Sequence, residues 1–266
     1  MASFRETALK RRQCLAACMA WAGVGRGQDL PTLTIGFDEG SPPTMYRAAP
    51  RLQAHGIYPA LVGAAFALMG RPCELHALPF KRMLGGADAD QLLAGAVVRT
   101  PDRERRWLFS QPYFMERLAV YTAGPPFRSL ADLTGKRVGV IRGWSYGEAF
   151  DMARQQGLFL CEEVPTDANN FGKLLRERLD FAVVTELAGR MLLQLPGFEG
   201  HVVAGAAPLG VTPIHLALRQ GHSGGAALLG AFNAAVDQLY RDGQVEPLVA
   251  REIAAAAQVV KAQPVH

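Results

Sequence analysis

Short apolar segments of two kinds alternate along most of the chain. One kind is brief and rich in β-branched or alternating apolar residues, which is typical of strands. The other is longer, apolar on one or more faces and often followed by glycine, which is typical of helices. The pattern predicts strands over 33–37, 74–78, 92–98, 118–121, 137–141, 159–164, 181–184 and 214–218. It predicts helices over 59–69, 80–84, 129–133, 147–155, 170–178, 187–193, 226–240 and 246–257.

Strands and helices take turns in this order, which favours parallel sheets in an α/β fold. The dipeptide Pro125-Pro126 opens a second α/β set, and the strand near Ile214 returns to the first. We therefore expect a two-lobed α/β fold whose hinge is made of two crossing segments. The expected boundaries are 31–117 plus 213–252 for lobe one, 118–212 for lobe two and 253–266 for a C-terminal tail.

The first 26 residues differ from the rest and are expected to be a secretory signal peptide. Lys10-Arg11-Arg12 precedes a short apolar stretch over 14–24, and small residues follow it. This stretch is too short to cross a bilayer as a helix. Cleavage between residues 22 and 27 would leave a periplasmic mature chain. Two alternatives stay open: a lipobox that makes Cys18 a lipidated N-terminus, and a buried N-terminal helix.

Composition and charge exclude several classes of protein. Apolar residues make up 49% of the 266 and charged residues 20%, so the chain has enough apolar content to form a core and is not a disordered type. The net charge of +4 comes mainly from residues 1–25, which hold four of the 28 cations and one of the 24 anions, leaving 24 and 23 elsewhere. A nearly neutral body gives no electrostatic support for binding nucleic acid.

Cysteine and histidine give no sign of a disulfide framework or a metal site. After the signal is removed only Cys73 and Cys161 are left, in different predicted lobes, so we expect two buried, unpaired thiols. The six histidines are scattered, without the short spacings of metal-ligand sets. The sequence contains no P-loop or dinucleotide fingerprint, so neither a metal nor a cofactor is expected.

A series of short motifs runs along the chain in a specific order. The motifs are Asp38 with Pro42-Pro43, Gly56, PFKR at 79–82, TPDR at 100–103, FSQPYF at 109–114, SLADL at 129–133 with GKRVGV at 135–140, and DFAVV at 180–184. Together they resemble the bacterial extracellular solute-binding proteins of the polar-amino-acid type. The resemblance covers roughly residues 33–249, and it implies the two-lobed periplasmic-binding-protein fold with a ligand cleft between the lobes.

The resemblance also implies roles for individual residues in that cleft. Arg103 matches the family arginine that grips a carboxylate, and a planar guanidinium can donate two parallel hydrogen bonds to one carboxylate. Phe80 matches the aromatic residue that packs on the ligand. Asp38 ends the first strand, where relatives often place a carboxylate that binds the ligand's side chain. Trp144 and Ser145 lie in the turn whose hydroxyl and N–H groups relatives direct at the carboxylate.

The chain departs from the family pattern at several positions. Thr185 stands where the family's amino-group aspartate is expected, and Glu186 is the adjacent acid. Smaller departures are Ala96 and Val98 for small polar residues, Ser41 for an aromatic residue, and Tyr58 and Ala60 for an acidic pair. A clamp for a free α-amino acid is thus incomplete, and we expect an organic anion or an amino-acid derivative at least as readily. The predicted ligand contacts are Asp38, Ser41, Phe80, Val98, Arg103, Trp144, Ser145, Thr185 and Glu186.

Three other functions stay open. Residues 143–147 fit the G-x-S-x-G nucleophile elbow, so a serine hydrolase would use Ser145. Its acid and its histidine would come from Asp167 or Asp180 and from His201 or His215. An enzyme on the same fold is a second alternative, because cyclohexadienyl dehydratases resemble this family. A ligand-sensing periplasmic domain is the third, since a clamshell can report its occupancy to a receptor.

The sequence favours a monomeric periplasmic solute-binding protein that serves an ABC importer and is not an enzyme. A small carboxylate-bearing solute, whether an amino acid, a derivative or an organic anion, would bridge both lobes and stabilise the closed state. The expected partners are this ligand and an inner-membrane ABC permease. No nucleic acid, metal, cofactor or catalytic residue is expected.

Overall fold

The computed structural model describes residues 31–48 and 52–262. The strands are β1 (Leu33–Asp38), β2 (Gly40–Ser41), β3 (Met45–Arg47), β4 (Ala54–His55), β5 (Cys73–Leu78), β6 (Leu93–Val97), β7 (Trp107–Phe109), β8 (Phe114–Thr122), β9 (Arg137–Ile141), β10 (Leu160–Val164), β11 (Phe181–Thr185) and β12 (Val203–Arg219). The helices are α2 (Ile57–Leu68), α3 (Phe80–Asp88), α4 (Pro101–Glu104), the 3₁₀ helix η1 (Leu130–Leu133), α5 (Glu148–Gln155), α6 (Asp167–Leu175), α7 (Glu186–Leu192), α8 (Gly225–Arg241) and α9 (Val245–Ala262). The signal peptide expected over 1–26, with Cys18, lies outside the described residues.

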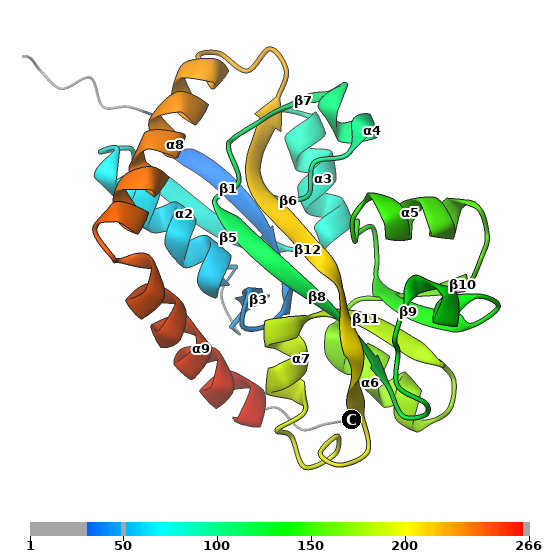
Figure 1. The fold of residues 1–266 in the computed structure, drawn as a ribbon. Helices are drawn as coiled ribbons and strands as arrows, with labels where there is room; N and C mark the ends of the chain where they lie inside the picture. The colour runs from blue at the N-terminus through cyan, green and yellow to red at the C-terminus, as the bar shows by residue number, and fades with distance from the viewer. Residues whose placement is uncertain (1–30, 49–51, 263–266) are drawn as a thin grey trace, which may run out of the picture. The chain divides into compact units, whose positions relative to one another are not determined.

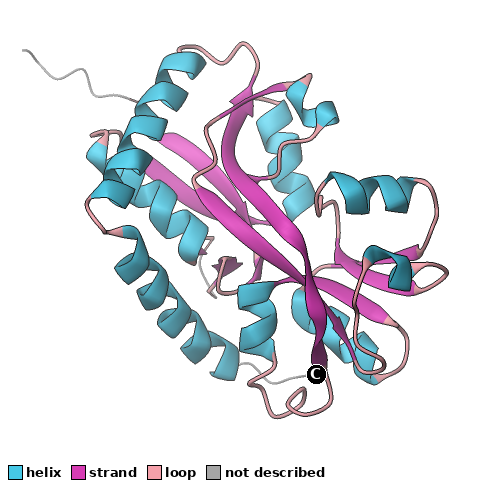
Figure 2. Cartoon of the chain, viewed as in Figure 1, coloured by secondary structure: helices cyan, strands magenta, loops and turns pink. Residues whose placement is uncertain are grey.

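Two sets of parallel strands are joined through two long antiparallel strands (Figure 1). In the first half β1 pairs in parallel with β5 and β6, and in the second half β9 pairs in parallel with β10 and β11. Strands β8 and β12 pair with each other; β8 also pairs with β11, and β12 with β6 and β7. Helices flank the strands of both halves (Figure 2). The α/β architecture and its two crossing segments are those predicted.

The two crossing segments are continuous strands. Arg117 pairs with Val211 and Leu118 with Gly210, so the boundaries expected at 117/118 and 212/213 fall inside β8 and β12. Backbone contacts join the described residues from Thr32 onward into one unit. The division into lobes at those boundaries therefore stays a prediction.

Strand β12 is much longer than the strand predicted over 214–218. It has 17 residues, and its register against β8 shifts on either side of Pro208. Proline lacks a donor for the ladder and glycine lacks a side chain to pack, so Gly205, Pro208 and Gly210 weaken the strand signal in the sequence. Pairing with β8 continues through this stretch and keeps it extended.

Three threonines fix the starts of helices that border the candidate site. Thr100, Thr166 and Thr185 accept a hydrogen bond from a backbone N–H at the start of α4, α6 and α7, which satisfies a donor left free by the helix. Gly143 follows β9 with a φ of 79°, a left-handed conformation that favours glycine. These caps and this turn set the positions of the loops between strand ends and helices.

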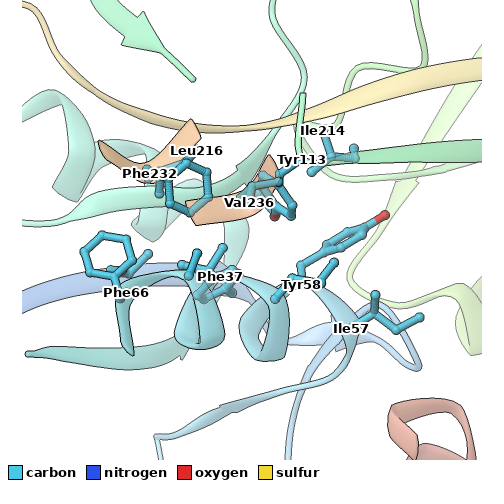
Figure 3. Close-up of a cluster of buried hydrophobic side chains, with 14 of the residues drawn as sticks. Phe37, Ile57, Tyr58, Phe66, Tyr113, Ile214, Leu216, Phe232 and Val236 are labelled. Atoms are coloured by element: carbon cyan, nitrogen blue, oxygen red, sulfur yellow. The ribbon is translucent and has the colours of Figure 1, made fainter. Parts of the chain in front are cut away.

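The core of the first half lies between its strands and helices α2 and α8 (Figure 3). Phe66 and Tyr113 both pack against Phe232, with ring centroids 6.0 and 5.9 Å apart. In the second half a separate cluster surrounds Phe171, which packs against Tyr121 at 5.1 Å. Each half thus has a core of its own.

Helix α9 packs on both of these cores. Leu248 is buried in the cluster of the first half, whereas Ala256 and Val260 are buried in the cluster around Phe171. The apolar pattern ended this helix at residue 257 and placed residues from 253 onward in a tail. The helix instead continues to Ala262 because Ala256 and Val260, four residues apart, share one apolar face.

Over the described residues, no helix combines the length and apolar character that a membrane span needs. Cys73 and Cys161 are unpaired, as expected, but each is half-buried rather than fully buried. Within the same residues no group of three or more His, Cys, Asp or Glu side chains is arranged to hold a metal ion.

Candidate functional site

A small cavity of about 30 Å³ lies beside the crossing strands, with walls from both halves. Its lining residues are Met45, Tyr58, Phe80, Ala96, Val97, Val98, Arg103, Glu116, Leu118, Trp144, Ser145, Thr185, Thr212 and Ile214. Six of the nine predicted ligand contacts are among them: Phe80, Val98, Arg103, Trp144, Ser145 and Thr185. The other three, Asp38, Ser41 and Glu186, do not line the cavity.

Arg103 is the only cationic side chain in the lining described, and it is 7% exposed. Thr100 caps α4 by accepting a hydrogen bond from the backbone N–H of Arg103 at 3.3 Å. The guanidinium donates from Nη1 to the carbonyl of Val98 at 2.8 Å and from Nη2 to the carbonyl of Gly143 at 3.3 Å. These two acceptors belong to opposite halves, so Arg103 connects them.

The surroundings of Arg103 keep it charged. Its carbon Cζ lies 5.6 Å from the ring centroid of Phe80, a cation–π distance. Burial lowers the pKa of Arg103 to about 10, with Asp151 acting in the opposite direction. No carboxylate of the described chain bonds to this guanidinium; its acceptors are main-chain carbonyls. It is therefore cationic at neutral pH and can take a carboxylate as an additional acceptor.

Trp144 connects the cavity to Asp38. The indole Nε1 donates to Asp38 Oδ2 at 2.8 Å, and the ring of Trp144 lies 6.1 Å from that of Phe80. Burial raises the pKa of Asp38 to about 6, while the hydrogen bonds from the Glu39 N–H and from Trp144 lower it. Asp38 thus positions an aromatic wall of the cavity from behind.

Ser41 forms a third hydrogen bond between the halves. Its hydroxyl donates to Asp167 Oδ2, and both side chains are buried. Burial raises the pKa of Asp167 to about 7, and the hydrogen bond from Ser41 opposes this rise. Nearby, a Cβ on Gly40 would come within 2.7 Å of the carbonyl oxygen of Pro165, so the β2 backbone needs glycine to approach α6.

Three further predicted residues have defined local partners. The hydroxyl of Ser145 donates to Asp151 Oδ2, whose other oxygen accepts from the N–H of Tyr146 at 3.2 Å. Thr185 borders the cavity, and its hydroxyl caps α7 by accepting a hydrogen bond from the backbone N–H of Ala188. Glu186 instead forms ion pairs with Arg117, at 2.6 Å, and with Arg190, outside the cavity lining.

Glu116 is a cavity residue that the sequence reasoning missed. It lies in β8, is 2% exposed, and accepts a hydrogen bond from the hydroxyl of Tyr58. Burial raises its pKa to about 8; the Tyr58 hydrogen bond lowers it, and the charges of Asp167 and Glu186 raise it. The backbone N–H of Arg117 also lowers the pKa of Glu116, but no cationic side chain is among the groups that act most strongly on it.

The alternation of buried and exposed residues along β8 indicates that the side chain of Glu116 points inward. Met115 and Arg117 are exposed, whereas Glu116, Leu118 and Val120 are buried on the opposite face. Successive strand residues point to opposite faces, so an acid in phase with Leu118 and Val120 is predicted to point inward. The predicted strand began at Leu118, two residues too late to include it.

The serine-hydrolase alternative gains no support from the contacts. The hydroxyl of Ser145 is bonded to Asp151, while Nδ1 of His215 lies 2.8 Å from the carbonyl oxygen of Ser110. His201 lines a different, larger hollow of about 820 Å³ beside Asp180. The described contacts therefore join Ser145 to neither of the histidines that a triad would need.

Comparison with known proteins places this geometry in context. The family model described as bacterial extracellular solute-binding proteins, family 3, matches residues 33–253. The curated proteins contain no match to the chain.

Solved structures share the fold at low sequence identity. A histidine kinase sensor domain similar to periplasmic binding proteins is 22% identical, with a TM-score of 0.73, covering 84% of this chain and 96% of its own. An ancestral arginine-binding protein bound to arginine is 21% identical, with a TM-score of 0.71, covering 83% and 97%. An amino-acid ABC transporter substrate-binding protein from Streptococcus pneumoniae, bound to L-arginine, is 18% identical, with a TM-score of 0.71, covering 85% and 96%. These matches confirm the predicted two-lobed periplasmic-binding-protein fold.

Proposed function

This chain belongs to family 3 of the bacterial extracellular solute-binding proteins, and on that premise we propose that it captures a small carboxylate-bearing solute for an ABC importer. The observation that carries the proposal is Arg103: a buried guanidinium that borders the cavity, with main-chain carbonyls as its acceptors. A ligand carboxylate would receive charge-assisted hydrogen bonds from it, each contributing about 1.5–3 kcal/mol.

Two solved neighbours of the same fold are described as bound to arginine, which supports an amino acid or a related solute as the ligand class. The polar groups around the cavity fit such a solute. Tyr58, Ser145, Thr185 and Thr212 bring hydroxyls, and Phe80 and Trp144 bring aromatic faces. A few placed polar groups within an apolar lining are typical of small-molecule sites.

Ligand entry on this proposal requires the two halves to separate. The cavity measures about 30 Å³, whereas sites for small-molecule ligands usually measure about 300–1,000 Å³. Separation would break the three hydrogen bonds described above: Arg103 with the Gly143 carbonyl, Trp144 with Asp38, and Ser41 with Asp167. A ligand that bridges the halves would restore the closed state through its differential contacts.

The ligand role of Arg103 is tested by calorimetry and thermal shift with amino acids, their derivatives and small organic acids. Arg103→Ala is expected to weaken binding of every carboxylate ligand at least tenfold. Arg105→Ala is the matched control, because Arg105 is exposed and pairs with Asp102 at 2.8 Å. An unchanged dissociation constant in Arg103→Ala removes Arg103 from the site.

Hinge closure is tested by distance measurements between spin labels on the two halves. Leu68 on α2 and Leu158 before β10 are both exposed and suit labelling after Cys73 and Cys161 are replaced by serine. Saturating ligand is expected to narrow the distance distribution and shift it to shorter values. A distribution that ligand leaves unchanged contradicts closure.

Delivery to the periplasm is part of the proposal, since a binding protein must meet its permease outside the cytoplasm. Cell fractionation and N-terminal sequencing test it, with cleavage expected between residues 22 and 27. A lipid on Cys18 would instead support the lipoprotein alternative.

Size-exclusion chromatography with light scattering tests the expected monomer.

A sensory role is the second candidate, because one structural neighbour is a sensor domain of a histidine kinase. The same closure would then be read by a receptor. The genes beside this one discriminate: a permease and an ATPase support transport, and a sensor kinase supports signalling. In either role the ligand leaves the site chemically unchanged, so incubation with p-nitrophenyl esters is expected to give no turnover that depends on Ser145.

A further inference from the structure

Glu116 occupies an unusual position for a carboxylate. It lies in the middle of β8, opposite Thr212 of β12, where the two crossing strands pair. A charged carboxylate is costly to remove from water unless a cation or several hydrogen bonds compensate it. Here the side chain is buried and receives the Tyr58 hydroxyl, with no cation from the described chain.

Among the described residues that line the cavity, one side chain is basic, Arg103, and one is acidic, Glu116. The other described residues of the lining are apolar or carry a neutral polar group. The apolar part consists of Met45, Phe80, Ala96, Val97, Val98, Leu118 and Ile214. A ligand with only a carboxylate would match Arg103 and leave the carboxyl group of Glu116 without a charged partner.

The packing around Tyr58 fixes where Glu116 can point. Tyr58 is buried in α2, and its ring lies 6.1 Å from Tyr113 and 5.5 Å from Phe114. Tyr58 and Tyr113 both belong to the buried cluster of the first half (Figure 3). The hydroxyl that reaches Glu116 therefore comes from a packed aromatic cluster. A carboxylate held on one oxygen by a fixed donor is preorganised to present its charge to a ligand.

We propose that Glu116, positioned by Tyr58, is a cation subsite, so that the ligand is a small zwitterion with a protonated amine on Glu116 and its carboxylate on Arg103. This inference rests on the proposed function, because it assigns the second end of the same ligand. It narrows the solute class from any small carboxylate to amine-bearing carboxylates. The raised pKa of Glu116 agrees with an acid that ionises when a cation arrives.

The test uses probe pairs that differ only in the amine: L-alanine with propionate, 4-aminobutyrate with butyrate, and L-arginine with 5-guanidinopentanoate. Binding to the purified chain is measured by calorimetry. The wild type is expected to bind the amine member of at least one of the first two pairs at least tenfold more tightly. The third pair asks whether a guanidinium alone satisfies Glu116.

Glu116→Gln keeps the shape of the side chain and an acceptor for Tyr58 while removing the charge. It is expected to reduce the preference for the amine member to within threefold, by weakening that member and leaving its amine-free analogue unchanged. Tyr58→Phe is expected to reduce the preference partially. Glu199→Gln is the matched control, since it removes the same charge from an exposed loop position.

The outcomes separate this inference from the proposed function. A wild-type chain that binds amine-free analogues as tightly as amines, or a Glu116→Gln variant that keeps the preference, overturns the cation subsite and leaves the carboxylate site standing. Amine-free binding that Arg103→Ala does not weaken, or no binding of any probe, overturns the proposed function and the inference with it. The midpoint of thermal unfolding of unliganded Glu116→Gln, expected to be no lower than that of the wild type, excludes misfolding as the cause.

Discussion

The two charged ends of the cavity are built in opposite ways. Arg103 lies on a short helix between strands, is held by two main-chain carbonyls, and keeps its charge at neutral pH because its pKa is still about 10. Glu116 lies inside a strand, receives one hydroxyl, and is mostly protonated at neutral pH because its pKa is about 8. On the proposed binding mode, this difference couples ligand binding to a proton at the Glu116 end of the site and not at the Arg103 end.

The largest expected effect is the pH dependence of amine binding. A protonated amine needs the ionised form of Glu116, so affinity for 4-aminobutyrate should rise by up to about tenfold for each pH unit between 6 and 8. Above pH 8 it should level off. The affinity ratio of 4-aminobutyrate to butyrate, measured by calorimetry, isolates Glu116 from other groups.

Butyrate is the internal control for this measurement. Binding of butyrate and of 4-aminobutyrate depends on the same Arg103 and on the same contacts of Asp38 and Asp167 between the halves. The pKa values of Asp38 and Asp167, about 6 and 7, also fall near the pH range of the measurement, so their titration affects both probes alike. The other groups acting on Glu116 are Glu186, which raises its pKa, the backbone N–H of Arg117, which lowers it, and Tyr58, whose own pKa is well above 10. An affinity ratio that does not change with pH in the wild type would contradict the proposed role of Glu116 at its end of the cavity.

The second effect is a loss of stability with rising pH in the unliganded protein. In the unfolded chain these carboxyl groups ionise near pH 4, whereas Asp38, Asp167 and Glu116 hold their protons to about pH 6, 7 and 8. The unfolded state therefore gains relative to the folded state as pH rises from 5 to 8. We expect the midpoint of thermal unfolding, measured by calorimetry, to fall over this pH range.

Variants at the two ends should respond differently in that experiment. Glu116→Gln and Asp167→Asn should each flatten the decline, because each removes a group with a raised pKa. Arg103→Ala should leave the decline in place, because Arg103 does not titrate in this range. A midpoint of thermal unfolding that rises from pH 5 to 8 in the wild type and in all three variants would contradict the claim that burial raises the pKa of these carboxyl groups.

A smaller effect is expected when Arg103 keeps its charge and loses its shape. Lysine offers a point charge in place of a planar fork, and it cannot serve the carbonyls of Val98 and Gly143 together with a ligand as arginine does. Arg103→Lys should weaken butyrate and 4-aminobutyrate alike, by about fivefold, or about 1 kcal/mol. Full affinity in this variant would show that charge alone suffices; Arg105→Lys is the control.

The smallest effects are expected from removing one donor to a buried carboxyl group at either end. Trp144→Phe removes the donor to Asp38, and Tyr58→Phe the donor to Glu116. Each should destabilise the fold by about 1 kcal/mol. The two should differ in binding: Tyr58→Phe changes the preference for amines, whereas Trp144→Phe weakens both members of a pair equally. Identical binding changes in the two variants would mean that the ends are not distinct.

The sequence could predict the arginine end and not the acid end, for reasons that lie in their construction. Arg103 and Phe80 belong to short motifs whose geometry is set by neighbouring residues in the sequence. Thr100, for example, caps α4 by accepting from the backbone N–H of Arg103. Glu116 belongs to no motif, and its place depends on the phase of one strand and on Tyr58, 58 residues away. Because Thr185 is uncharged, the sequence predicted an organic anion or an amino-acid derivative at least as readily as a free amino acid. On the proposed cation subsite, Glu116 supplies the missing charge from the neighbouring strand.

Long-range pairing also explains the predicted residues that do not line the cavity. Asp38 reaches Trp144 and Ser41 reaches Asp167, contacts separated by 106 and 126 residues. The strand predicted over 214–218 was shorter than β12 for a related reason, because pairing with β8 outweighs the local effect of Pro208. By contrast, the strands over 137–141 and 181–184 and the helix at 129–133 were predicted well because their patterns are local.

Helix α9 packs on the cores of both halves, with Leu248 in the first and Ala256 and Val260 in the second. On the proposed closure, the last turns of this helix would have to follow one half or detach when the halves separate. The proposed equilibrium between open and closed forms would then depend on this helix as well as on the ligand. Shortening the chain there, or attaching a bulky tag, should alter solute affinity with every residue of the cavity intact.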